Sequence, residues 1–349
     1  MGSEPRRDAS RRATARARVD IRQVAEAAGV SPGTVSNTLN HPERVSPATR
    51  AAVLQAVARL GFVPNQQARV LTGAPSNIIG LVILDVRSPF FTELAHAVER
   101  VAADQNYLLL LSNSENDRDR EAQLLRVLAA QRVRGALLTP APGDDPVVDR
   151  LPADVPVVLI DHDGPEDVCS VSVDHVDGGR IAARHLVGLG HTTFGFVGGP
   201  VDLHQVVQRR EGFTAELRAS GVDIEQALTS VHVPGIEIRA GVEAGLRLLR
   251  RPLPTAIFCA NDLIAFGVYR ALARAGVTVP GDVSLVGYDD IDVAADWVVP
   301  LTTVRQPTTE MGQRAAALLF EHAAGAPDHR HKQVILAPEL VVRASTRAR

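Results

Sequence analysis

Six side chains stand where they could bind a small polar ligand. Apolar, strand-like runs of this sequence end just before polar or aromatic residues, and in open α/β sheets ligands bind outside the carboxyl ends of the strands. Carboxylates, an amide and a guanidinium beside aromatic rings suit polyhydroxylated molecules such as sugars, through bidentate hydrogen bonds and ring stacking. Each residue alone could equally be a helix cap or a surface charge. The six candidates are Phe90, Phe91, Asp161, Arg209, Asn261 and Asp289.

Signatures of catalysis and of metal binding are weak in this sequence. It contains no G-x-G-x-x-G, no G-x-x-x-x-G-K-[ST] and no H-E-x-x-H, and its single lysine is Lys332. Cys169 and Cys259 lie in apolar stretches and are expected to be small buried hydrophobes. His329 and His331 lie in a polar loop and are expected to be solvated. We therefore expect no catalytic residues, no metal site and no cofactor.

Charge is distributed unevenly along the 349 residues. Residues 1–73 contain 11 arginines against 5 acidic residues, whereas the remainder contains 26 basic against 35 acidic residues. A basic N-terminal part suits a polyanion such as nucleic acid, although solvated basic tails are also common. The first 20 residues lack the apolar segment of a secretory signal, and no apolar run approaches the roughly 20 residues of a membrane span. A cytoplasmic location is expected.

Residues 19–64 carry the start and stop signals of three short helices. Asp20 with Gln23 is typical of a capping box, and Gly29 is suited to end the first helix. Ser31-Pro32 then provides an N-cap followed by proline at the first helical position. A second helix that begins with small polar residues after a glycine turn is typical of a helix-turn-helix motif that enters the DNA major groove. Short helix pairs also occur in ordinary cores.

From residue 76, apolar strand-like runs alternate with amphipathic segments of helical length. This alternation indicates parallel sheets covered by helices on both faces, and its length favours two lobes. The predicted fold class is an α/β core of two doubly wound parallel-sheet lobes with an N-terminal all-α helix-turn-helix domain. The expected parts are a disordered basic tail at 1–18, the DNA-binding domain at 19–64, a hinge helix and linker at 65–75, the two-lobed core at 76–342 and a C-terminal tail at 343–349.

Several runs together form a long and specific pattern. In the N-terminal part they are Val24-Ala25-x2-Ala28-Gly29-Val30-Ser31-x2-Thr34-Val35-Ser36-x2-Leu39-Asn40, Val45-Ser46-x2-Thr49-Arg50 and Leu60-Gly61-Phe62-x-Pro64-Asn65, and further matches include Ser88-Pro89-Phe90-Phe91 and Asn261-Asp262. With them, residues 19–342 resemble the LacI/GalR (lactose-repressor) family of bacterial transcriptional regulators. The resemblance implies a two-lobed core like that of periplasmic binding proteins, a homodimer, a pseudo-palindromic double-stranded DNA operator and a small-molecule effector.

The resemblance also implies roles in DNA binding. The family's variable base-reading positions fall on Pro32, Gly33 and Asn37, and of these Asn37 can pair bidentately with adenine. The alternative is that Asn37 contacts only phosphate or water. Leu71 falls at the family's minor-groove wedge, with helix packing as the alternative, and Arg69 beside it is expected to contact phosphate. Residues expected to contact phosphate, or to serve as caps, are Ser31, Thr34, Ser36 and Asn40.

The predicted function is that of a sequence-specific transcriptional repressor. Its operator affinity would be controlled by an effector, a sugar or related metabolite, bound in the cleft between the lobes. The rival hypothesis is a sugar-binding or sugar-processing protein that keeps the two-lobed core and uses its basic N-terminus for another purpose. The missing secretory signal and the intact pattern over residues 19–73 favour the regulator.

Overall fold

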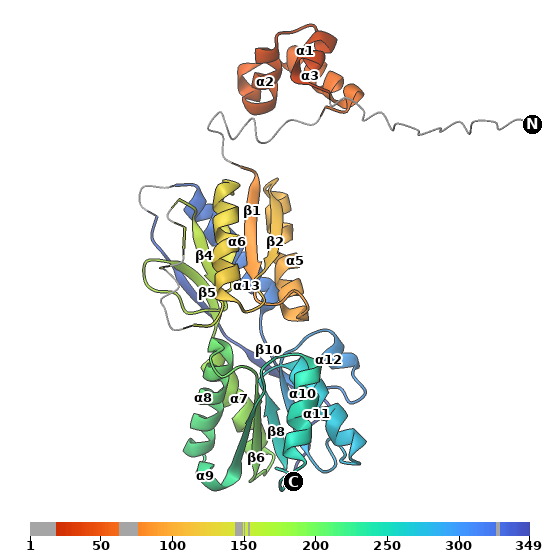
Figure 1. Ribbon diagram of the computed structural model, residues 1–349, viewed down its shortest axis with the longest axis vertical. Helices are drawn as coiled ribbons and strands as arrows, with labels where there is room; N and C mark the ends of the chain where they lie inside the picture. The colour runs from red at the N-terminus through yellow and green to blue at the C-terminus, as the bar shows by residue number, and fades with distance from the viewer. Residues whose placement is uncertain (1–18, 63–75, 144–148, 150, 153, 326–328) are drawn as a thin grey trace, which may run out of the picture. The chain divides into compact units, whose positions relative to one another are not determined.

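The structure is a computed structural model that describes residues 19–62, 76–143, 149, 151–152, 154–325 and 329–349 (Figure 1). The chain divides into two compact units, Met1–Ala74 and Pro75–Arg349. The predicted hinge helix, with Arg69 and Leu71, and the predicted basic tail lie outside the described residues.

The small unit is the predicted set of three helices. The capping box is present, because Asp20 accepts a hydrogen bond from the Gln23 backbone and the Gln23 side chain accepts one from the Asp20 backbone. Gly29 follows the first helix with φ 67°, a left-handed conformation that glycine adopts without strain. Val24, Val35 and Val53 form its buried centre. Its elements are α1 (Ile21–Ala28), α2 (Pro32–Asn40), a 3-10 turn (Pro42–Arg44) and α3 (Pro47–Leu60).

Lobe 1 of the large unit is a parallel sheet of six strands in the order β11-β5-β4-β3-β1-β2. Most of its strands are buried on both faces, as a sheet between helices requires. Its strands are β1 (Ile78–Ile83), β2 (Leu108–Asn113), β3 (Ala136–Leu138), β4 (Val157–Ile160), β5 (Cys169–Val173) and β11 (Gln333–Leu336), and its helices are α5 (Pro89–Asp104), α6 (Arg118–Ala130) and α13 (Thr308–Ala323).

Lobe 2 is a second six-stranded sheet, in the order β12-β10-β9-β8-β6-β7. Its edge strand β12 pairs antiparallel with β10, so the expectation of wholly parallel lobes is wrong at this edge. The strands are β6 (Phe194–Gly198), β7 (Leu228–His232), β8 (Ala256–Cys259), β9 (Ser284–Asp289), β10 (Thr302–Arg305) and β12 (Glu339–Val341). The helices are α7 (His175–Gly188), α8 (His204–Ala219), α9 (Ile224–Ala227), α10 (Ile238–Leu248), α11 (Asp262–Arg274) and α12 (Val293–Asp296).

The chain passes between the lobes three times, after β5, after β10 and after β11 (Figure 1). The last passage exists because the two C-terminal strands belong to different sheets, β11 to lobe 1 and β12 to lobe 2. Residues 343–349 are not a free tail: Ser345 is buried and bonds Leu285 and Thr302, and the Arg349 backbone donates to the Leu189 carbonyl. This packing saturates backbone groups of lobe 2 that would otherwise be unpaired.

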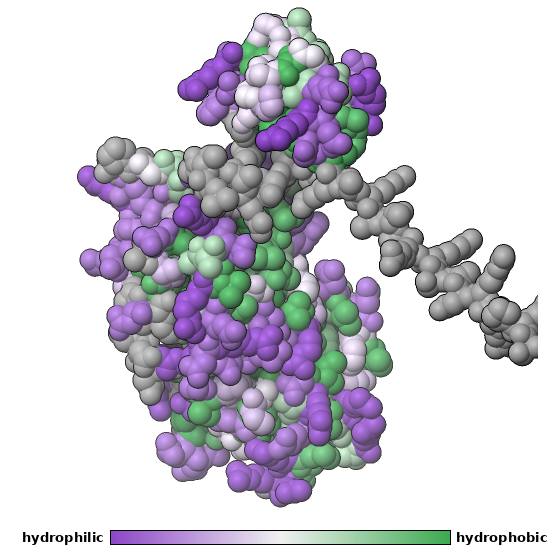
Figure 2. All heavy atoms as spheres, turned by 45° about the horizontal axis from the view of Figure 1, so that its top comes forward, coloured by the Kyte–Doolittle hydropathy of each residue, from purple (hydrophilic) through white to green (hydrophobic). Residues whose placement is uncertain are grey.

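The surface shown in Figure 2 mixes hydrophilic residues with scattered apolar patches. Among the described residues, no helix is both long enough and apolar enough to cross a membrane.

Candidate ligand pocket and DNA-binding surface

A small pocket lies at the junction of the two lobes. All six side chains that the sequence analysis singled out for ligand binding line it. They come together because each lies at the carboxyl end of a strand that faces the other lobe or, like Arg209, on the helix that follows such a strand. The pocket is also lined by three polar residues that the sequence analysis missed, Ser88, Gln205 and Gln306.

The backbone at the strand ends places two aspartates toward the pocket. Asp161 follows β4 with φ 56°, and Asp289 ends β9 with φ 108°, both in the region that non-glycine residues rarely adopt. Such conformations persist where the surrounding structure holds them, and they are concentrated at functional sites. Phe90 and Phe91, in the first turn of α5, meet edge to face with ring centroids 5.0 Å apart and form the apolar wall.

Asn261 is held in place by contacts of both ends of its amide. It caps α11, because its Oδ1 accepts from the Ile264 backbone at 2.8 Å, and its Nδ2 donates to the Ile236 carbonyl at 3.0 Å. The second hydrogen on Nδ2 is left over after these bonds. Asn261 is thus both a helix cap and a residue that can donate to a ligand.

A buried chain of polar contacts connects Asp161 with Arg209. The Nε2 atom of His175 bonds Asp161 Oδ1 at 2.8 Å, and Arg209 Nε donates to His175 Nδ1 at 3.3 Å. Since Nδ1 accepts from Arg209, the proton of a neutral imidazole lies on Nε2 and points at the carboxylate. Burial lowers the pKa of His175, which favours this neutral form. Although burial alone would raise the pKa of Asp161, the hydrogen bonds from His175 and Gln205 and the charge of Arg209 hold it below its ordinary value.

Arg209 is the cation at the centre of the pocket wall. Its Nη1 donates to the Ala260 carbonyl at 2.6 Å and lies 3.6 Å from Asp289 Oδ1. Its guanidinium carbon lies 3.7 Å from the centroid of the buried Tyr288 ring, a cation–π contact. The sequence analysis identified neither His175 nor Tyr288 as a pocket residue. Their neighbours along the chain do not show that either side chain contacts an arginine on another element.

Asp289 is held in an environment that disfavours its charge. Burial raises the pKa of Asp289 to about 7, despite the opposing effects of Arg209 and of the hydrogen bond from Gln306. The Gln306 Nε2 atom donates to Asp289 Oδ1 at 2.7 Å, which leaves Oδ2 free of the bonds described above. A carboxyl group that titrates near neutral pH in a pocket is a candidate functional group.

Two amide oxygens in the pocket lack partners. Gln205 donates through its Nε2 to Asp161 Oδ2 at 2.7 Å, and Gln306 donates to Asp289, so both amides are oriented by carboxylates. Within the described residues, the Oε1 atoms of both glutamines are buried and accept no hydrogen bond. An unpaired buried acceptor is costly, and a ligand that brings donors removes that cost.

The start of α2 presents a small polar surface to solvent. Ser31, Pro32, Gly33 and Asn37 are exposed, whereas Val35 and Thr38 face the core of the small unit. Ser31 also caps α2, because its Oγ accepts from the Thr34 backbone at 3.1 Å and contacts the Thr34 hydroxyl at 2.9 Å. Both hydroxyls therefore have a structural role. Ser36 and Thr34 are half-buried, and Asn40 ends α2.

His331 is exposed, as expected, whereas His329 is half-buried rather than fully solvated. Cys169 is fully buried, as expected, but its thiol lies 3.5 Å from His329 Nε2 and 3.6 Å from His331 Nδ1. The loop that carries the two histidines folds back onto β5, because the strand that follows it, β11, pairs with β5. Because Cys169 and His329 are 160 residues apart in the sequence, no local pattern predicts this contact.

Asp290, the carboxylate next to Asp289 in the sequence, pairs with Arg305 at 2.7 Å and with Arg343 at 2.6 Å, so its charge is compensated by arginines.

Comparison with known proteins relates both units to one class of regulator. Residues 20–65 match the family described as bacterial regulatory proteins, lacI family, and residues 183–346 match the periplasmic binding protein-like domain. The ribose operon repressor of Escherichia coli (strain K12) is 35% identical over 333 residues, which cover 93% of this chain and 99% of that protein.

Two solved structures are similar over long parts of the chain. The Lac repressor dimer bound to operator and the anti-inducer ONPF is 29% identical, covers 95% of this chain and 99% of its own, and superposes with a TM-score of 0.84. A LacI family transcriptional regulator from Enterococcus faecium with bound ribose is 30% identical, covers 77% of this chain and 98% of its own, and has a TM-score of 0.70.

Proposed function

The chain belongs to the lacI family of bacterial regulatory proteins, and from this we propose that it is a transcriptional repressor whose operator affinity is set by a small polyhydroxylated effector. It is a regulator and not an enzyme. It acts as a homodimer on a pseudo-palindromic operator, and the similar Lac repressor is likewise a dimer bound to operator. It acts in the cytoplasm, where bacterial DNA lies.

The unpaired acceptors of the pocket carry the proposal about the effector. The Oε1 atoms of Gln205 and Gln306 and the carboxylate of Asp289 can each accept a hydrogen bond from a ligand. They therefore favour a ligand with several hydroxyl donors. Phe90 and Phe91 add an apolar surface on which a sugar ring can stack. A monosaccharide fits this chemistry, and one similar regulator binds ribose.

The DNA-binding role rests on α2. Pro32 and Gly33 cannot hydrogen-bond a base through their side chains, so we assign direct readout to the exposed Asn37. Ser31 and Thr34, whose hydroxyls already cap the helix, orient its N-terminus and contact phosphate. Arg69 is assigned to phosphate and Leu71 to a minor-groove wedge on the basis of the family pattern alone.

The switch follows from the three chain passages between the lobes. A ligand that bonds Asp161 on one side and Gln205 and Asp289 on the other favours one orientation of the lobes, and a dimer transmits this preference to the paired hinge segments. Effector and operator binding are then coupled, and each must change the affinity of the other by the same factor.

Operator titration tests the proposal. An operator is first selected from random DNA with the full-length protein, and its affinity is then measured by fluorescence anisotropy with and without a panel of pentoses and hexoses. At least one sugar should shift the affinity. If no operator can be selected, the hypothesis of a transcriptional regulator is wrong. If an operator is selected but no sugar changes its affinity, the proposed class of effector is wrong.

A pair of arginine variants locates the effector site. Arg209→Ala should retain operator affinity and lose the response, because its charge-assisted hydrogen bonds cannot be replaced. The control is Arg210→Ala, since Arg210 is the exposed neighbour on the same helix. If the operator affinity of Arg209→Ala still responds fully to the effector, Arg209 does not belong to the effector site.

A further inference from the structure

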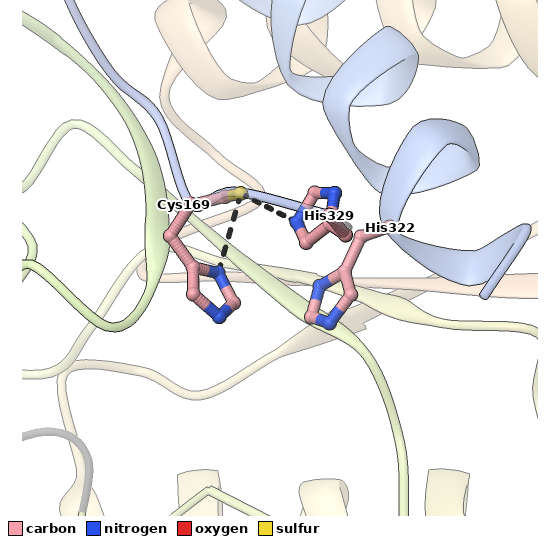
Figure 3. Close-up of side chains that lie close together, drawn as sticks. Cys169, His322 and His329 are labelled. Atoms are coloured by element: carbon pink, nitrogen blue, oxygen red, sulfur yellow. Dashed lines mark hydrogen bonds between the residues drawn. The ribbon is translucent and has the colours of Figure 1, made fainter. Parts of the chain in front are cut away.

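A thiol and three imidazoles lie together in lobe 1, and none of these four residues lines the pocket. Cys169 is the first residue of β5, His322 lies in the last turn of α13, and His329 and His331 lie just before β11. One potential ligand atom from each residue lies within 4.8 Å of all the others. Figure 3 shows the side chains of Cys169, His322 and His329 directed toward one another.

The cluster is partly enclosed. Cys169 is buried, His322 and His329 are half-buried, and His331 is exposed. The site therefore has one open side through which an ion can enter, while the thiol lies against the sheet.

Two distances within the cluster match those between ligands of a tetrahedral metal ion. With Zn–S near 2.3 Å and Zn–N near 2.0–2.1 Å, tetrahedral geometry separates a sulfur from a nitrogen ligand by about 3.5 Å. The thiol sulfur lies 3.5 Å from His329 Nε2 and 3.6 Å from His331 Nδ1. Both contacts thus have the spacing of two edges of one tetrahedron.

Hydrogen bonds alone do not account for this arrangement. A thiol has one proton, so it can donate to one of the two nitrogens that face it and can only weakly accept from the other. Within the described residues, the buried Nδ1 atoms of His322 and His329 have no hydrogen-bond partner. The rings of these two residues are parallel, 4.5 Å apart, and His331 meets both nearly at right angles. Polar rings are therefore packed together without a network that satisfies them.

We propose that Cys169, His322, His329 and His331 bind one Zn²⁺ ion. On binding, the Cys169 thiol releases its proton to solvent, and the thiolate and three neutral imidazoles each donate a lone pair to the metal. One soft sulfur and three nitrogen ligands suit zinc, whereas Mg²⁺ and Ca²⁺ require oxygen. Four protein ligands leave no open position, so the site is structural rather than catalytic.

The ion would join segments that the sheet holds only weakly. β11 is the edge strand of lobe 1 and is paired on one side alone, with β5. The metal links the start of β5 to the end of α13 and to the segment before β11, and so closes the loop between α13 and β11. Because β11 leads directly into the third passage between the lobes, the ion stabilises the lobe 1 end of that passage.

Metal analysis of the full-length protein, prepared without a histidine tag, tests this proposal. After removal of metal and equilibration with Zn²⁺, elemental analysis should give one zinc per chain, and thermal unfolding should shift to higher temperature. Replacement by Co²⁺ should produce the visible bands of tetrahedral cobalt and a sulfur-to-cobalt charge-transfer band in the near ultraviolet. No bound zinc, or a cobalt spectrum without the charge-transfer band, would overturn the assignment.

Ligand variants make the test specific. Cys169→Ser and His331→Ala should each weaken zinc binding by more than the roughly 10–100-fold that loss of an outer-shell partner costs. His331→Ala is informative even if the cysteine variant does not fold, because His331 is exposed. The control is His96→Ala, an exposed histidine on α5 outside the cluster, which should bind zinc as wild type does. Undiminished zinc affinity in His331→Ala would refute the proposal.

Discussion

Asp289→Asn is expected to make the protein more stable at neutral pH while weakening its response to the effector. The side chain lies at the end of β9 in lobe 2, where burial raises the pKa of Asp289 to about 7 from an ordinary value of 3.8. Asparagine keeps the shape and the oxygen that accepts from Gln306 Nε2. It removes the titrating charge and replaces the other oxygen by an amide nitrogen.

The magnitude follows from proton linkage. Because the folded state holds this proton more tightly than the unfolded chain, stability decreases as pH rises from about 4 to 7, and above pH 7 the full cost is present. A pKa that is about three units higher in the folded state lowers the free energy of unfolding by roughly 4 kcal/mol at pH 8 and by roughly 2 kcal/mol at pH 5. The advantage of Asp289→Asn over wild type should therefore grow by roughly 2–3 kcal/mol between these two pH values.

Urea unfolding at pH 5 to 8 measures this difference, with the fluorescence of the single tryptophan as the probe. Trp297 belongs to lobe 2, where its ring stacks on Phe266 with centroids 4.1 Å apart. Asp292→Asn is the matched control, because Asp292 is exposed and three residues away. If the advantage of Asp289→Asn is the same at every pH, Asp289 titrates as an ordinary carboxyl group and the reasoning is refuted.

Effector affinity should rise by up to about 10-fold from pH 6 to pH 8, because Asp289 ionises over this range and can then accept a hydrogen bond from a ligand hydroxyl. If calorimetric titration shows no rise, Asp289 does not contact the ligand. Asn37→Ala should relax base preference at one position of each half-site, by about 1–3 kcal/mol, and selection from random operators with unchanged preference would make Asn37 a phosphate contact. Leu71→Ala should reduce both operator affinity and DNA bending without lowering thermal stability, and normal bending in a gel-shift assay would contradict a wedge. Operator affinity should fall steeply with salt, since the basic N-terminal part neutralises several phosphates; anisotropy with a flat salt response would argue against phosphate contacts.

Local chemistry in the sequence determined the small unit and much of the pocket. Caps at Asp20 and Ser31 and the left-handed turn at Gly29 depend on residues within four positions of one another, so their pattern predicts the helices directly. The six predicted pocket residues line one cavity because parallel strands bring their carboxyl ends to one edge of a sheet, which makes the position after each strand informative by itself.

Only the tertiary structure decided which polar groups meet across long separations. The unpaired oxygens of Gln205 and Gln306, and the neutral His175 between Asp161 and Arg209, depend on how two lobes and several helices pack, and no short pattern encodes that packing. Cys169 and His329 are separated by 160 residues, yet the pairing of β11 with β5 brings thiol and imidazole together. Alternating apolar positions indicate that a strand is buried, but they do not say which strand lies beside it. The neighbours of a side chain are set by sheet order, and sheet order is a property of the whole fold.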